Sequence, residues 1–342
     1  MNARVTICAV VVASVIVLGA SQVADAQVDW THHGIVVTPG GPGTWNSNRT
    51  IPGDVVFDGT EYHMYLIGGE GWNPLAQSWA VGHWTSTEIQ GPWTPDPCNP
   101  VLEPEPGEWD EFSIGHIAVL YDAGLFRMWY AGTGTAWGQA LVGYATSVTG
   151  NCYWSRYAGN PLPGLDPGLP GAWDATGVWP SSVLFDGTEY HMWFTTGSGG
   201  WDAWNIGYAT SYDGLDWSKH GAPVVQPDQA WEGDRVYAPE VISIGDVLGM
   251  WYSGYPSGGT AQVGYAISPD GIAWGKWPDN PVLSPLPGTG VGDSATVILE
   301  GDTFHGWVGH GVDTSYATSP FEVLQFDGFE SGDSSIWGGI AP

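Results

Sequence analysis

The sequence predicts an all-β protein, a five-bladed β-propeller whose blades are four-stranded antiparallel sheets. Three observations support this prediction. The 342 residues include 52 glycines and 26 prolines, which favours many tight turns over long helices. Short apolar stretches are joined by Asp-Gly turns, as in antiparallel hairpins. A group of motifs recurs about every sixty residues, which is the size of one blade.

The clearest repeat is a six-residue stretch that reads VGYATS in its fullest form. It occurs five times, at 81–86, 142–147, 206–211, 263–268 and, in a weaker copy, 314–319. Each copy follows a stretch of the form DGTEYHMW, nearly identical at 58–65 and 186–193. The five copies predict five blades, with these two stretches as neighbouring middle strands of each blade.

The remaining strands of each unit follow in a constant order. An apolar inner strand precedes each Asp-Gly turn, and the five inner strands align on their first valine: Val55, Val119, Val183, Val241 and Val297. The outer strand comes after the VGYATS stretch and leads to Asn-Pro at 99–100, 160–161 and 280–281. Most tryptophans recur at the same place in each unit, so we expect them to pack between blades rather than bind sugar.

The fifth unit has no outer strand after Ser319. The segment 30–46 resembles the end of the other units, because 42–46 matches 106–110 and 170–174. The sequence therefore predicts that an N-terminal strand completes the last blade and closes the ring, which leaves no sheet edge exposed.

The two ends of the chain differ in composition from the predicted propeller, which spans residues 27–325. Residues 1–26 have a basic start, an apolar run and an Ala-x-Ala site, which indicates a signal peptide and secretion; a membrane anchor is the alternative. Residues 326–342 are acidic and rich in Gly and Ser, and we expect a flexible tail or the stub of a further module. The mature chain would keep Cys98 and Cys152, which in a secreted protein suggest one disulfide; two unpaired core cysteines are the alternative.

The charge restricts the partners. Seven Lys and Arg stand against 36 Asp and Glu, for a net charge of −29. Nucleic acids and anionic membrane surfaces are therefore excluded as partners, and beyond the N-terminal segment no apolar run is long enough to span a bilayer. We expect a monomer.

These motifs resemble the five-bladed propeller glycoside hydrolases, a superfamily that includes family 43 arabinanases and xylosidases and family 32 invertases. The resemblance covers nearly all of the predicted mature chain. It implies cleavage of O-glycosidic bonds by carboxylates at the starts of the inner strands. The stretch YAPEV at 237–241 resembles the family's Ala-Pro-Asp-Val element, so Glu240 corresponds to the acid that tunes the proton donor. The family's Asp-Pro and Glu-Gly-Pro elements are absent.

Strand alternation supplies a second route to the site. The residues just before the five aligned valines are Asp54, Ala118, Ser182, Glu240 and Thr296, and strict alternation would turn them toward the central funnel. Asp54 and Glu240 are the two carboxylates among them, and we predict them as the catalytic acid/base pair. Arg49 and Arg235 each lie five residues earlier, as predicted substrate-binding donors. The alternative is two structural ion pairs that brace the strand starts.

Four further residues are predicted to bind substrate: His116, Tyr237, Trp179 and Asp293. His116 should point into the channel, either as a ligand or as an ordinary buried histidine, and Asp293 could equally be a turn residue. No cofactor motif or Cys/His metal spacing occurs, so no cofactor is expected to be required. A structural calcium ion in the central channel is a candidate.

The sequence therefore favours a secreted glycoside hydrolase acting on an oligo- or polysaccharide. The alternative is a non-catalytic propeller that binds carbohydrate or serves as a scaffold, because fold alone carries no activity.

Overall fold

The computed structural model describes residues 30–71, 78–136, 138–199, 203–256, 258–284 and 292–321. The predicted signal peptide at 1–26 and the predicted tail at 326–342 lie outside these residues. In the described part, no helix has the length and hydrophobicity needed to cross a membrane.

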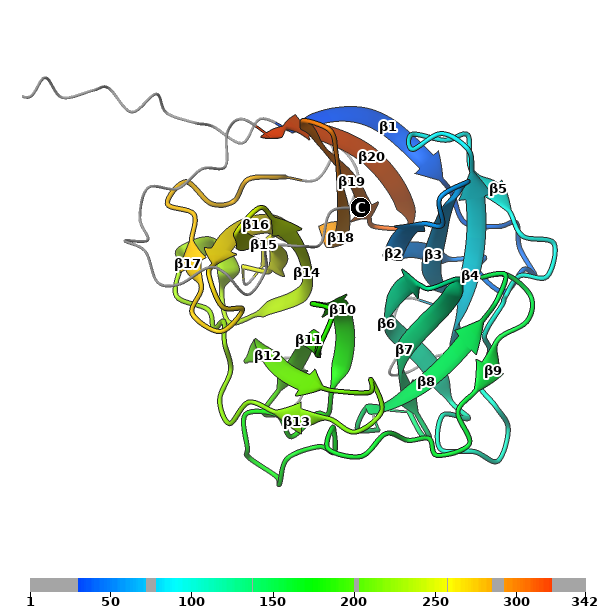
Figure 1. Ribbon diagram of the computed structural model, residues 1–342, viewed down its shortest axis with the longest axis horizontal. Helices are drawn as coiled ribbons and strands as arrows, with labels where there is room; N and C mark the ends of the chain where they lie inside the picture. The colour runs from blue at the N-terminus through cyan, green and yellow to red at the C-terminus, as the bar shows by residue number, and fades with distance from the viewer. Residues whose placement is uncertain are drawn as a thin grey trace, which may run out of the picture.

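The described strands form five antiparallel sheets of four strands each, arranged around a centre (Figure 1). Blade 1 consists, from the inside outward, of β2 (Arg49–Phe57), β3 (Tyr62–Gly69), β4 (Trp79–Ser86) and β5 (Thr94–Pro95). Blade 2 consists of β6 (Ser113–Asp122), β7 (Leu125–Thr133), β8 (Leu141–Ser147) and β9 (Ser155–Arg156). Blade 3 consists of β10 (Trp179–Phe185), β11 (Tyr190–Gly197), β12 (Trp204–Ser211) and β13 (Ser218–Lys219). Blade 4 consists of β14 (Val236–Ile244), β15 (Val247–Gly254), β16 (Gln262–Ser268) and β17 (Gly275–Lys276). Blade 5 consists of β18 (Gly292–Glu300), β19 (Thr303–His310), β20 (Asp313–Pro320) and β1 (Thr31–Val37). A single 3₁₀ turn, Ala230–Glu232, precedes blade 4.

The fold prediction is confirmed, including the closure of the ring. β1 pairs antiparallel with β20, from Thr31 opposite Thr318 to Val37 opposite Thr314, so the first described strand completes the last blade. Figure 1 shows β1 running alongside β20 at the outer rim of that blade.

The recurring motifs are structural. The Asp58 carboxylate accepts the backbone N–H groups of Thr60 (2.7 Å) and Glu61 (2.8 Å), and Asp186 does the same in blade 3, so the Asp-Gly turns are fixed by side-chain capping. The side chain of Asn160 accepts the N–H of Tyr144 and donates to its C=O, which ties the end of blade 2 back to its third strand; Asn99 and Asn280 do the same in blades 1 and 4.

Four tryptophans at one repeat position pack between blades, as predicted. Trp129, Trp193, Trp251 and Trp307 occupy the same position of the second strand in blades 2 to 5, and all four are fully buried. Trp129 Nε1 donates to the backbone oxygen of Gly214 in the next blade (2.8 Å). Gly214 has a φ of +76°, and a Cβ there would lie 3.0 Å from the indole, so the turn needs glycine.

Cys98 and Cys152 form the predicted disulfide between blades 1 and 2, with their Cα atoms 5.3 Å apart. The bond closes a loop of 54 residues.

Three blades carry the same ion pair between an acid that precedes the inner strand and a base on the outer strand. The pairs are Arg156 with Asp110, Lys219 with Asp174 (2.5 Å) and Lys276 with Glu232 (2.7 Å). Blade 1 has Asn46 and Pro95 at these two positions. Where the outer strand lacks a cation, the buried acid is replaced by an amide, because an unpaired buried charge is expensive.

This pattern predicts the effect of breaking one of these ion pairs. Asp110 is fully buried, so Arg156→Gln leaves a buried carboxylate without its cation and should lower the free energy of unfolding by about 3 kcal/mol. Adding Asp110→Asn recreates the neutral state of blade 1 and should restore much of the loss. Urea denaturation of both variants measures the difference. If Arg156→Gln alone is as stable as the double variant, the ion pair does not have the proposed effect on stability.

Candidate functional site

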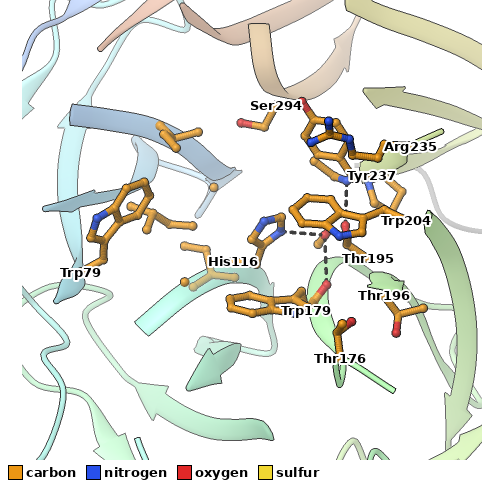
Figure 2. Close-up of a pocket in the computed structure, with 18 of the residues that line it drawn as sticks. Trp79, His116, Thr176, Trp179, Thr195, Thr196, Trp204, Arg235, Tyr237 and Ser294 are labelled. Atoms are coloured by element: carbon orange, nitrogen blue, oxygen red, sulfur yellow. Dashed lines mark hydrogen bonds between the residues drawn. The ribbon is translucent and has the colours of Figure 1, made fainter. Parts of the chain in front are cut away.

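A cavity of about 630 Å³ lies at the centre of the propeller, with lining residues from all five inner strands. Aromatic rings form much of its wall: Trp79, Trp179, Trp204, Tyr237 and Tyr255. Figure 2 shows the three indoles at different sides of the cavity with His116 between them. Flat apolar rings with a few polar groups between them suit a ligand that presents both C–H faces and hydroxyls.

All five inner strands carry a β-bulge within the four residues before the aligned valine. The pairing shifts register between Pro52 and Asp54 in blade 1 and, one residue earlier in the aligned strand, between Gly115 and Ile117 in blade 2; the other three blades have a shift in the same stretch. A bulge inserts an extra residue and re-aims the side chains on either side of it. The strict alternation assumed from the sequence is therefore interrupted where the cavity begins, and of the residues just before the five valines only Glu240 lines the cavity.

Glu240 combines access to the cavity with deep burial. Its side chain is 7% exposed, and its Oε1 accepts a hydrogen bond from Thr296 Oγ1 (3.3 Å). Burial, reinforced by the nearby negative charge of Asp54, raises the pKa of Glu240 well above the usual range for a carboxyl. A carboxyl that stays protonated beside a cavity can act as a general acid.

Asp54 lies behind the cavity wall. It is 7% exposed, and its Oδ2 accepts the backbone N–H of Val119 in blade 2 (2.6 Å). Burial raises the pKa of Asp54 to about 7. The same position ties neighbouring blades elsewhere, since Ser182 accepts the N–H of Val241 (3.0 Å). Asp54 therefore joins blades 1 and 2 and acts on Glu240 through its charge, without being one of the groups that line the cavity.

This placement predicts a pH effect on stability. The folded protein raises the pKa of Asp54 from 3.8 to about 7, so the native state binds this proton more tightly than the unfolded chain does. The free energy of unfolding should therefore fall as the pH rises from about 4 to about 7. Asp54→Asn cannot ionise, its amide oxygen can still accept from Val119, and above pH 7 it should be the more stable protein by a few kcal/mol.

The measurement is urea denaturation of wild type and Asp54→Asn at several pH values. Ser182→Ala is the matched control, because it breaks the corresponding tie in blade 3 without a titrating group and should shift stability equally at every pH. If the free energy of unfolding depends on pH in the same way for wild type and Asp54→Asn, Asp54 is not a buried carboxyl that ionises in this range.

The two predicted arginines both line the cavity and lie near Tyr237. The Arg49 guanidinium is 6.0 Å from the Trp79 ring, and burial lowers its pKa to about 10. Arg235 stacks over Tyr255 at 4.6 Å and contacts Asp234 (3.2 Å), so its observed carboxylate partner is its neighbour and not Glu240. Burial raises the pKa of Tyr237, while the charges of Arg49 and Arg235 oppose that rise. The predicted residues Arg49, Arg235 and Tyr237 thus form one polar side of the cavity, and Figure 2 shows Arg235 beside Tyr237.

His116 and Trp179 lie together on another side. The His116 Nδ1 is 3.3 Å from Ser181 Oγ, and its ring meets Trp179 edge-on with centroids 5.6 Å apart. Burial lowers the pKa of His116 to about 4, so the imidazole is neutral at ordinary pH. The backbone of His116 has a φ of +26°, an unfavourable conformation for a residue other than glycine.

Asp293 belongs to β18, but its side chain lies outside the described residues. The neighbouring Ser294 lines the cavity and donates to the Pro52 backbone oxygen (2.9 Å). Glu240 is the one carboxylate among the described side chains that line the cavity, which does not fit calcium, an ion that takes six to eight oxygen ligands. Among the described residues, the one cluster of potential metal ligands is Asp96 with Cys98 and Cys152, whose sulfurs are in the disulfide.

The sequence interpretation missed Trp79, Trp204, Tyr255 and Ser181 as cavity residues. Trp79 and Trp204 each begin the third strand of a blade, at the end that opens into the cavity. Both tryptophans lie a few residues before the Val-Gly or Ile-Gly of the repeat, and this is the sequence signal that could have found them. The sequence interpretation instead counts them with the tryptophans that pack between blades.

Comparison with known proteins finds similar sequences and similar folds. No family model matches the chain. An uncharacterized protein of Mycobacterium tuberculosis is 25% identical over 259 residues, 72% of this chain and 81% of the relative. The 1,2-beta-oligomannan phosphorylase of Thermoanaerobacter sp. (strain X514) is 29% identical over 225 residues, 61% of this chain and 67% of the relative.

Solved structures share the architecture at low identity. A glycoside hydrolase matches with a TM-score of 0.66 and 17% identity, covering 89% of this chain and 95% of that one. The beta-1,2-mannobiose phosphorylase of Listeria innocua, in complex with beta-1,2-mannobiose, gives 0.62 and 14%, covering 84% and 96%. A thermostable family-43 glycoside hydrolase gives 0.61 and 20%, covering 85% and 95%. The resemblance to glycoside hydrolase propellers is confirmed at the level of the fold.

Proposed function

We propose that the chain is a secreted enzyme that hydrolyses a glycosidic bond in a mannan-type oligosaccharide. Glu240 carries the proposal: it is a buried carboxyl at a cavity walled by aromatic rings, and burial raises its pKa well above the usual range. It would protonate the leaving glycosidic oxygen, the step that every glycoside cleavage by a general acid requires. The oligomannan phosphorylase relative supports the substrate class.

Asp54 completes the proposed pair by electrostatics. When Asp54 is ionised, above its own pKa of about 7, its charge adds to the effect of burial and raises the pKa of Glu240 further, so Asp54 would help keep the acid protonated in that range of pH. Arg49, Arg235 and Tyr237 would bind sugar hydroxyls on one side of the cavity, and Trp179 would stack against a sugar ring on another.

Phosphorolysis is the second candidate. The chain has seven basic residues in all, and two of them lie at this cavity beside Tyr237. A pair of guanidinium groups suits an oxyanion, and phosphate as attacking group would need one protein acid only.

The test is incubation with β-1,2-mannobiose and a panel of plant and microbial glycans, with and without inorganic phosphate. Free mannose released without phosphate supports hydrolysis. Sugar phosphate formed only when phosphate is present supports the second candidate. Binding of a glycan by calorimetry with no product in either condition would overturn both and leave the carbohydrate-binding propeller.

A further inference from the structure

We propose that His116 is the base of this reaction, the group that takes the proton from the attacking water while Glu240 protonates the leaving oxygen. The proposal rests on the proposed hydrolysis and adds the second half of its proton transfer. Both side chains line the same cavity, His116 from β6 of blade 2 and Glu240 from β14 of blade 4.

The hydrogen bonds around Ser181 determine which nitrogen of His116 carries the proton. A serine hydroxyl has one hydrogen, and that of Ser181 donates to the Trp179 backbone oxygen (3.2 Å). With that hydrogen directed to Trp179, the Ser181 oxygen, which lies 3.3 Å from His116 Nδ1, is placed to accept a hydrogen bond from it. The neutral imidazole then has its hydrogen on Nδ1 and a lone pair on Nε2.

The Nε2 lone pair is available to a ligand. Figure 2 shows the His116 ring projecting into the cavity, with its one drawn hydrogen bond running to the Ser181 side. Among the described residues no hydrogen-bond partner lies at Nε2. A neutral imidazole with its Nδ1–H fixed by a protein acceptor is the arrangement that makes Nε2 a proton acceptor.

The backbone supports a functional role for this side chain. His116 is the extra residue of the bulge in blade 2, and its backbone has a φ of +26°. Unfavourable backbone conformations cost about 1–3 kcal/mol each and concentrate at functional sites. Ala238 in the bulge of blade 4 has a similar φ of +48° and presents a methyl group to the cavity, whereas the bulge of blade 2 presents an imidazole.

The protons and bonds of the step balance. Water oxygen bonds to the anomeric carbon as the bond from that carbon to the leaving oxygen breaks. One water proton passes to His116 Nε2, and the proton of Glu240 passes to the leaving oxygen. The cavity then holds an imidazolium and a carboxylate, and it returns to the starting state when one proton leaves His116 and another binds Glu240 from solvent.

The basicity of His116 suits this role. Burial lowers its pKa to about 4, close to that of an ordinary aspartate, so Nε2 is free of a proton at neutral pH and about as basic as a carboxylate base. The other ionisable groups of the described cavity wall are Glu240, Arg49, Arg235, Tyr237 and Tyr255. Burial is the cause of the lowered pKa of His116.

The experiment compares wild type and His116→Gly on β-1,2-mannobiose. The variant removes the imidazole and fits the positive φ, so it should fold with an undiminished melting temperature and cleave about 10²–10⁴-fold more slowly. Ala238→Gly is the matched control for stability, because Ala238 occupies the bulge of blade 4 with a φ of +48° and carries no titrating group. Imidazole added to the buffer should restore part of the rate of His116→Gly, which a structural role would not allow.

A measurement independent of activity tests the tautomer. Nitrogen-15 NMR of the His116 ring should show hydrogen on Nδ1 in wild type, and Ser181→Ala should shift the ring toward a mixture of tautomers. Hydrogen on Nε2 in wild type would overturn the inference. If wild type cleaves mannobiose and His116→Gly is fully active, the inference about His116 is also overturned, while the proposed function stands. A wild type that cleaves nothing in the panel would overturn both.

Discussion

Replacing Glu240 by Gln should lower the rate of glycoside cleavage by about 10²–10⁴-fold and leave the fold intact. The amide has the volume of the carboxyl and can still accept from Thr296, but it has no proton of suitable acidity to give to the leaving oxygen. The loss should appear in kcat rather than KM, because the proton is transferred in the transition state and not on binding.

The pH profile gives a second measure of the same residue. Because burial and Asp54 raise the pKa of Glu240, wild type should stay active well above pH 5 and lose activity at higher pH as the acid ionises. Asp54→Asn removes the neighbouring charge and should move this alkaline limb to lower pH while activity persists. Thr296→Val, which removes only the hydrogen bond, is the matched control. A Glu240→Gln enzyme with full activity would leave carbohydrate binding as the better account.

The architecture could be predicted because the repeat is built from local rules. Asp58 and Asp186 cap their own turns, and Asn160 binds the backbone of its own blade, so each motif can be interpreted without knowing its neighbours. The closure by β1 followed from counting strands in the last unit.

The cavity could be predicted only in part, because its geometry depends on the bulges. Alternation correctly selected Glu240, yet it also turned Asp54 inward, where the structure has it bonded to Val119. A bulge depends on how two strands pair, and a single strand's residue pattern does not encode it. The aromatic wall escaped the sequence interpretation because Trp79 and Trp204 were grouped with the packing tryptophans, although the equivalent residues of blades 2 and 4 are Ala140 and Ala261.

The ring should open when β1 is removed. A chain that begins at Thr38 lacks the strand that pairs with β20, so the backbone groups of β20 between Thr314 and Thr318 lose their partners. It also loses Val37, which is 6% exposed and packs with Val55 of blade 1 and Trp307 of blade 5. The strand therefore links the first blade to the last as well as completing a sheet.

The expected effect of that deletion is loss of the soluble monomer. Trp30 packs edge-on against Trp251, and burying one large apolar side chain stabilises a protein by about 1.5–3 kcal/mol, so losing Trp30 and Val37 removes on the order of 5 kcal/mol. That is comparable with the whole stability of many domains, and the exposed edge of β20 would add a route to aggregation. Light scattering and thermal melting of the truncated chain measure both effects, and a synthetic peptide of residues 27–46 added during refolding should restore solubility by pairing with β20. A truncated protein that stays monomeric with an unchanged melting temperature would show that blades 5 and 1 hold together through their inner strands alone.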